Sequence, residues 1–256
     1  FHGGSGLHLG IDVLCDLDGC IPVVQLLGLD SDRPVALDAV GTLLVPAEPV
    51  PETYRRHARR FGATLHSREI DLRFQQAYSR IWSPQLSTRT SQEIEKARWR
   101  RLVHEVFQGS VRSKDSLFHA LWQHYARGEA WRLAEGVEAF IQHLNREQIA
   151  WAIASNFDQR LHSVVRSFSA LRGARFVFTS AELGVSKPSR VFFKRISEVL
   201  SHDSPLMIGD SLSQDIHGAL QAGWQAAWIT TKLFRPVEHP GLVFQGSLEA
   251  LVKAVT

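Results

Sequence analysis

The chain has few cysteines and no long apolar run. Cys15 and Cys20 are the only cysteines among 256 residues. No His or Cys pair follows them at the spacing of a zinc site, so we expect two reduced thiols. No stretch approaches the roughly 20 apolar residues of a membrane helix, and no basic region precedes an apolar run with a small-residue cleavage site. These absences predict a soluble cytoplasmic protein that does not bind membranes.

The chain also lacks a strong excess of charge of one sign. It has 29 Lys and Arg against 26 Asp and Glu, a formal net charge of +3. The basic residues alternate with acidic ones in helical stretches instead of forming a tail, so we expect no nucleic-acid partner. With 44% hydrophobic and 21% charged residues, the composition fits one medium α/β core plus a smaller domain.

The chain divides into three kinds of region with different sequence patterns. Residues 1–33 carry glycines and end in turn-forming residues, and we expect a leader outside the core. The only methionine is Met207, so a trimmed gene boundary is expected at the start. Residues 47–131 show helical periodicity without a convincing strand, which predicts an all-helical module. Residues 34–46 and 132–256 alternate strand and helix patterns, and repeated βα units of this kind predict a doubly wound parallel sheet.

Local patterns predict where individual helices begin and which faces they bury. Thr90 followed by Glu93 has the spacing of a capping box and predicts a helix that begins after Thr90. Apolar residues at helical spacing predict a helix over residues 188–200. Its four predicted inward-facing side chains are Val191, Phe192, Ile196 and Val199.

Polar residues gather where the expected strands end. Asp38 follows the apolar run 35–37, and Asp210 follows the run 206–208. Because ligands in open parallel sheets bind at the carboxyl ends of the strands, we expect these side chains to converge. The polar clusters are Asp38 with Thr42, Ser155 with Asn156, Lys187, and Asp210 with Asp215.

Two roles are expected for the acidic residues. An ionised Asp38 at a strand end attacks an electrophile and forms a covalent intermediate, which divides one hard step into two easier ones. Asp38, Asp210 and the main-chain carbonyl of Val40 offer the oxygen ligands that Mg²⁺ prefers. Asp215 is expected to join this metal site by orienting Lys187 or a metal-bound water.

The remaining polar residues are expected to bind the substrate. Lys187 neutralises charge on Asp38 and on an anionic substrate, and the Ser155 hydroxyl binds an oxygen of the reacting group. Thr42 and Asn156 complete the predicted phosphate-binding set. The implied partner is a small anionic molecule.

Together the clusters resemble the four motifs of the haloacid dehalogenase (HAD) superfamily. They read DAVGTL over residues 38–43, ASN over 154–156, SKP over 186–188 and IGDSLSQD over 208–215, in the order of that superfamily. The helical module resembles the superfamily's helical cap, so the resemblance spans roughly residues 34–250. It implies a Rossmann-like core with an inserted cap and a Mg²⁺-dependent hydrolase that uses Asp38.

Val40 departs from the superfamily's phosphatase pattern. Phosphatases of this kind usually carry a second Asp two residues after the nucleophile, as general acid and base. Valine cannot move a proton, and such help is worth about 10²- to 10⁴-fold. True haloacid dehalogenases also lack this Asp, but they work without metal and do not need the acidic residues of the last motif. This chain has both of those residues, Asp210 and Asp215. Phosphonate-cleaving relatives rely on a cap lysine, and Lys96 and Lys114 are the only lysines in the insert.

Four functions therefore stay open: a phosphatase of a small phosphorylated metabolite, a 2-haloacid dehalogenase, a phosphonatase-like hydrolase, and a binding protein that has lost turnover. A rival nucleophile is Asp16, because Asp18 supplies the missing second acid. The helical module, however, begins soon after Leu43, and the rival motif has no counterpart of Thr42. The sequence does not indicate the substrate or the oligomeric state.

Overall fold

A six-stranded parallel sheet forms the centre of the computed structural model. The model describes residues 15–16, 19–20, 29, 32–82, 88–232, 237 and 239–255. The strand order is β10-β9-β8-β3-β6-β7, and every pairing in this sheet is parallel. The strands are β3 (Val35–Leu37), β6 (Trp151–Ser155), β7 (Val177–Thr179), β8 (Leu206–Gly209), β9 (Gln225–Ile229) and β10 (Leu242–Gly246). The predicted parallel α/β sheet is confirmed.

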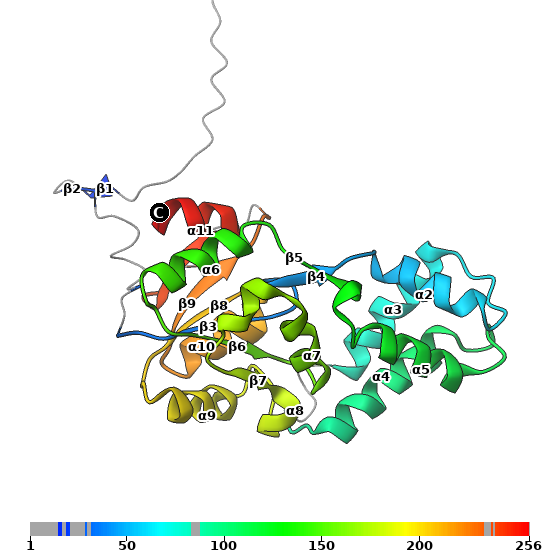
Figure 1. Cartoon of the computed structure of the whole chain (residues 1–256). Coiled ribbons are helices and arrows are strands. Elements are labelled where there is room, and N and C mark those ends of the chain that lie inside the picture. The colour runs from blue at the N-terminus through cyan, green and yellow to red at the C-terminus, as the bar shows by residue number, and fades with distance from the viewer. Residues whose placement is uncertain are drawn as a thin grey trace, which may run out of the picture.

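Helices cover both faces of this sheet (Figure 1). Because successive side chains of a strand point to opposite faces, Val35 and Leu37 of β3 join one hydrophobic cluster while Ala36 joins the other. The first cluster contains buried residues of α6, α7 and α11, and the second those of α9 and α10. The core helices are α6 (Val137–Arg146), α7 (Arg160–Ser167), α8 (Ser180–Leu183), α9 (Arg190–Leu200), α10 (His217–Gln221) and α11 (Leu248–Val255).

The buried face of α9 differs in part from the prediction. Phe192 and Ile196 are fully buried as expected, but Val191 and Val199 are each 48% exposed. Phe193 is fully buried in their place. Two adjacent phenylalanines can both be buried because the sheet and α10 contact neighbouring parts of the helix surface, so the inward stripe is centred on 192–196.

Four helices form a separate lobe beside the sheet (Figure 1). They pack around their own hydrophobic cluster, whose largest buried members include Phe107, Phe118 and Leu102. The antiparallel pair β4 (Leu44–Pro46) and β5 (Trp131–Leu133) joins this lobe to the core. The helices are α2 (Val50–Arg59), α3 (Ser67–Ile81), α4 (Gln92–Val106) and α5 (Lys114–His124). All four lie inside the predicted module 47–131, which we call the cap.

The predicted capping box at Thr90 is wrong by one residue. Helix α4 is capped by Ser91, whose hydroxyl accepts a hydrogen bond from the backbone N–H of Ile94. The Thr90 hydroxyl instead donates to the buried carboxylate of Glu95 at 2.5 Å. Ser and Thr are both good N-caps, and the contact with Glu95 engages the Thr90 hydroxyl, so Ser91 takes that role.

The predicted leader lies mostly outside the described residues. Within it, strand β1 (Cys15–Asp16) pairs only with β2 (Gly19–Cys20), apart from the central sheet. Asp18 of the rival motif is outside the described residues. The central strand is β3, and it leads to Asp38. Among the described residues, the model has no helix with the length and apolar character that a bilayer crossing demands.

His57 of α2 links the stability of the cap to pH. Its side chain is 93% buried, its ring lies 5.0 Å from that of His124, and its Nδ1 makes no hydrogen bond to any described residue. Burial, together with His124 and Arg56, lowers the pKa of His57 to about 4. Because an unfolded histidine titrates near 6.5, the unfolded chain binds more protons between these values. The contribution of His57 to the stability of the folded state is therefore greatest above pH 6.5, and it falls as the pH falls toward 4.

The substitution His57→Gln should flatten this pH dependence. On going from pH 7.5 to pH 5, we expect the wild type to lose about 1–2 kcal/mol more of its free energy of unfolding than the variant. Urea denaturation at the two pH values measures the difference. The exposed His66, changed to Gln, is the matched control. Equal pH slopes for the wild type and His57→Gln would contradict the prediction.

Candidate active site

Asp38 and Asp210 follow two hydrogen-bonded neighbours in the sheet. In the parallel register of β3 and β8, Leu37 lies opposite Ile208. The backbone N–H of Asp38 continues the ladder by donating to the carbonyl of Ile208 at 2.9 Å. The two strands therefore place both carboxylates at the same edge of the sheet, which is the arrangement the sequence predicted.

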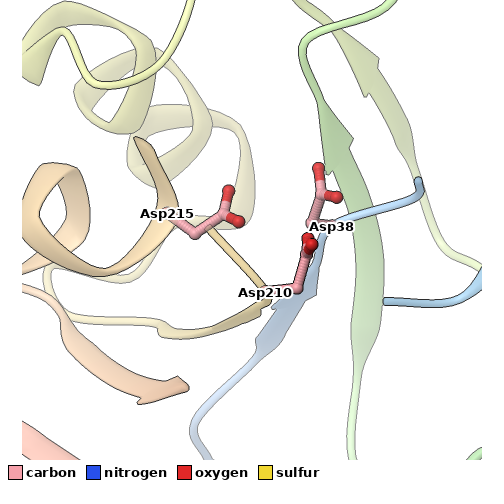
Figure 2. Close-up of side chains that lie close together, drawn as sticks. All are labelled: Asp38, Asp210 and Asp215. Carbon is pink, nitrogen blue, oxygen red and sulfur yellow. The ribbon is translucent and has the colours of Figure 1, made fainter. Parts of the chain in front are cut away.

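Three carboxylates meet at this edge. Oxygen atoms of Asp38, Asp210 and Asp215 all lie within 4.8 Å of one another. Figure 2 shows Asp38 and Asp210 side by side, with Asp215 reaching toward them from its own helical segment. Asp38 and Asp215 are 6% and 1% exposed, whereas Asp210 is open to solvent. The cluster thus has a buried side and an accessible side.

Two glycines allow the acidic side chains to come this close. Gly41 has φ +101°, and a Cβ on it would overlap the carboxyl group of Asp210. A Cβ on Gly209 would overlap the carboxyl group of Asp215 in the same way. Gly41 thus provides both the positive φ and the missing side chain that the site requires.

The ammonium group of Lys187 lies between two of the carboxylates. Its Nζ donates to Asp38 Oδ1 at 2.6 Å, to Asp215 Oδ1 at 2.5 Å and to the carbonyl of Ala154 at 3.0 Å. These contacts use all three donors of the side chain, which is 3% exposed. Burial opposes the charged form, but Asp215 and Asp38 outweigh it and raise the pKa of Lys187. The lysine is therefore a fixed cation and not a proton donor.

Asp210 and Asp215 hold their protons more strongly than free aspartates do. Burial, helped by Asp38 and opposed by Lys187, raises the pKa of Asp215 to about 7. Burial and the charge of Asp38 raise the pKa of Asp210 to about 6. Burial in the first place, and the like charge of Asp38 in the second, produce this pattern. The oxygen donors and the surplus negative charge together fit a hard divalent cation such as Mg²⁺.

Asn156 holds the loop that carries Lys187. Its Oδ1 accepts from the backbone N–H of Lys187 at 2.8 Å, and its Nδ2 donates to the carbonyl of Lys187 at 3.1 Å. The same Nδ2 donates to Gln214 Oε1 at 3.1 Å. The sequence predicted a substrate contact for Asn156, but in this structure its amide positions the lysine. Gln214, which belongs to this network, was not predicted.

Thr42 and Ser155 lie at the same edge of the sheet. Ser155 ends β6 and is buried, and Thr42 is 1% exposed. The Thr42 hydroxyl donates to Asp210 Oδ1 in a long hydrogen bond of 3.4 Å. All the predicted site residues are therefore near the carboxyl ends of β3, β6 and β8, while their roles toward a substrate stay predictions.

Arg160 is a buried residue near the site that the sequence analysis missed. Its guanidinium donates to both oxygens of Asp158, at 2.8 and 2.7 Å, and lies 3.4 Å from the centre of the Trp122 ring of the cap. An arginine at the first position of a helix has no sequence signal for such a contact. Asp158 also accepts from the backbone N–H of Arg160.

Comparison with known proteins finds HAD-like hydrolases among the relatives of this chain. A family model described as HAD-hydrolase-like matches residues 184–249. Haloacid dehalogenase-like hydrolase domain-containing protein 3 of Bos taurus is 27% identical over 200 residues, which cover 75% of this chain and 79% of that protein. These matches confirm the predicted resemblance to the HAD-like hydrolase superfamily.

Solved HAD structures share the fold. One, described as the HAD-hydrolase YfnB from Bacillus subtilis bound to magnesium, has a TM-score of 0.65 and 19% identity, covering 87% of this chain and 98% of that one. An L-2-haloacid dehalogenase from Xanthobacter autotrophicus has a TM-score of 0.61 and 17% identity over 78% of each chain. These structures show that the chain has the same fold.

The two cap lysines lie away from the carboxylates. Lys96 and Lys114 line an open groove on α4 and α5, and neither lines the cavities next to Lys187 or Val40. The Lys96 ammonium lies 5.9 Å from the Trp122 ring. A phosphonate-cleaving reaction that uses a cap lysine therefore gains no support from this arrangement.

Proposed function

We propose that this HAD-like hydrolase is a Mg²⁺-dependent phosphatase that acts on a small phosphorylated molecule through Asp38. The observation that carries the proposal is the group of three carboxylates around one ammonium. Three ionised carboxylates and Lys187 leave an excess of two negative charges. An anionic substrate would be repelled by this excess unless a divalent cation balanced it.

The chain offers the ligands for such a cation. Asp38 and Asp210 provide carboxylate oxygens, and the main-chain carbonyl of Val40 follows Asp38 closely. Asp215 shares Lys187 with Asp38 and accepts from the backbone N–H of Ser211 at 2.9 Å, so its role is to hold the lysine. When bound, Mg²⁺ would neutralise charge on the nucleophile and the phosphoryl group.

The residues divide the reaction between them. Lys187 holds Asp38 Oδ1, which leaves Oδ2 as the attacking atom. Attack on phosphorus forms an aspartyl-phosphate and releases the leaving group with the electron pair of the broken P–O bond. Thr42, Ser155 and the lysine are the groups that would bind the phosphoryl oxygens. Water then cleaves the intermediate and regenerates Asp38.

Metal removal tests the proposal. We expect purified protein to hydrolyse p-nitrophenyl phosphate, EDTA to lower the rate by more than about 10²-fold, and excess Mg²⁺ to restore it. Addition of Ca²⁺ is the control. It should restore less activity than Mg²⁺, because its larger coordination sphere fits the transition state less well. Absent turnover, or turnover that EDTA leaves unchanged, would contradict the proposal.

Val40 favours a second candidate, the dehalogenation of a short 2-halo acid. Halide leaves without a proton, so a site without a second acid is suited to it. Release of chloride from 2-chloropropionate in the presence of EDTA would support this candidate. If no halide is released from several halo acids, the dehalogenase candidate is ruled out. Inactivity toward both phosphate esters and halo acids would favour a binding protein.

A further inference from the structure

A cavity of about 240 Å³ lies between the cap and the core. Val40, two residues after Asp38, forms part of its wall. The position that usually carries the second acid therefore faces this cavity. Whatever is bonded to the reacting phosphoryl group on this side meets a methyl surface and not a proton donor.

Aromatic rings make up most of the remaining wall. They come from the cap and from the core, and each ring contacts the next at 5.4 to 6.4 Å between centroids. This series of rings runs through Phe157, Trp131, Tyr125, Tyr54, Phe74 and Tyr78. Interlocked aromatic side chains have few rotamers, so they form a preshaped site for a flat ligand.

The volume limits the size of that ligand. An apolar cavity of about 150 Å³ is known to accept benzene. A space of about 240 Å³ therefore accepts one substituted six-membered ring or a compact bicycle, but not a long chain.

The charge of the wall also limits the ligand. Among the described residues lining the cavity, only Arg160 has an ionised side chain. Asp158 pairs with it through two hydrogen bonds and Trp122 covers it. The cavity therefore offers no surplus cation for a carboxylate or a second phosphate, and an uncharged ring suits it best.

Leaving-group chemistry supplies the final constraint. Without an acid at Val40, the ester oxygen departs as an anion. A phenolic oxygen has a pKa near 10, whereas that of water, like an alcohol's, is close to 16. An oxygen bonded directly to an aromatic ring thus leaves far more readily than one bonded to an alkyl carbon.

We propose that the substrates are aryl phosphates, in which the ester oxygen is bonded directly to an uncharged aromatic ring held between the cap and Val40. The inference rests on the proposed phosphatase function. Asp38 attacks phosphorus, the P–O(aryl) bond breaks, and the aryl oxide leaves with the electron pair and takes a proton from solvent. Water then attacks the aspartyl-phosphate and releases inorganic phosphate and a proton.

Three substrates separate the requirements of this proposal. With Mg²⁺, we expect kcat/KM for phenyl phosphate to exceed that for benzyl phosphate by at least about 10²-fold. Both substrates carry the same ring, but the ester oxygen is bonded directly to the ring in phenyl phosphate and to an alkyl carbon in benzyl phosphate. Acetyl phosphate has a good leaving group but no ring, so its KM should be at least about 10-fold higher than that of phenyl phosphate. Equal kcat/KM for phenyl and benzyl phosphate, or equal KM for phenyl and acetyl phosphate, would overturn the inference. If none of the three substrates is cleaved, the phosphatase function itself is overturned.

Substitution of Val40 gives an independent test. Val40→Asp should raise kcat/KM for benzyl phosphate by at least about 10²-fold and that for phenyl phosphate by less than about 10-fold. Val40→Asn has the same shape without the proton and should produce neither gain. Equal gains for both substrates would show that the wild-type site is not adapted to aryl leaving groups. If Val40→Asp does not fold, the comparison of the three substrates with the wild type still decides.

Discussion

Asp38→Asn is expected to lower kcat by at least about 10³-fold, with little change in the fold. The amide keeps the size of the carboxyl group but loses the negative charge needed for attack. Lys187 retains Asp215 and the carbonyl of Ala154 as partners, so the lysine stays in place. Single-turnover and steady-state assays with p-nitrophenyl phosphate measure the loss, and circular dichroism checks the fold.

Asp203→Asn is the matched control. It is the same change at an exposed aspartate that precedes β8, at the opposite end of the sheet from Asp38. We expect its kcat to equal that of the wild type. A folded Asp38→Asn variant that keeps more than about a tenth of wild-type activity would rule out Asp38 as the nucleophile.

Lys187→Met should remove activity and destabilise the core together. The substitution leaves Asp38 and Asp215 buried with no cation between them. Breaking a buried ion pair by removing one partner costs about 3–5 kcal/mol, because the remaining charge is left uncompensated. Urea denaturation in the absence of metal should show this decrease in the free energy of unfolding. Lys194→Met, a change at an exposed lysine of α9, should alter it little.

The direction of the pH effect separates charge repulsion from lost packing. Without Lys187 the carboxylates bind protons more tightly in the folded state than in the unfolded state, so stability falls as the pH rises. The decrease in the free energy of unfolding caused by Lys187→Met should therefore be larger at pH 8 than at pH 5. Adding Asp215→Asn should recover part of the stability at pH 8 but none of the activity. A deficit independent of pH would indicate that packing, not charge, is the cause.

The sequence by itself determined the fold class and the order of the motifs. Short apolar runs that end in Asp38, Ser155 and Asp210 predict parallel strands that present polar residues at one edge, and the structure has that arrangement. The signal was strong because these strands are buried on both faces, which requires continuous apolar sequence. The helical module was predictable for a similar reason, since its apolar residues recur at helical spacing.

Helix boundaries and buried faces were predicted less well. Ser91 and not Thr90 caps α4, and Phe193 is buried where Val191 and Val199 were expected. Neighbouring residues have nearly equal local preferences in both cases. Contacts with distant segments, such as the hydrogen bond from the Thr90 N–H to the Gly184 carbonyl, decide between them.

Only the tertiary structure decided what surrounds the motifs. Asn156 has an amide side chain of the kind that binds substrates, yet it makes hydrogen bonds to the backbone of Lys187. The aromatic cavity at Val40 is built from segments about 100 residues apart in sequence, and no local pattern marks it. Spacing along the chain reports which side chains share a strand or a helix face. The environment of a reacting atom is instead set by long-range packing, which sequence periodicity does not encode.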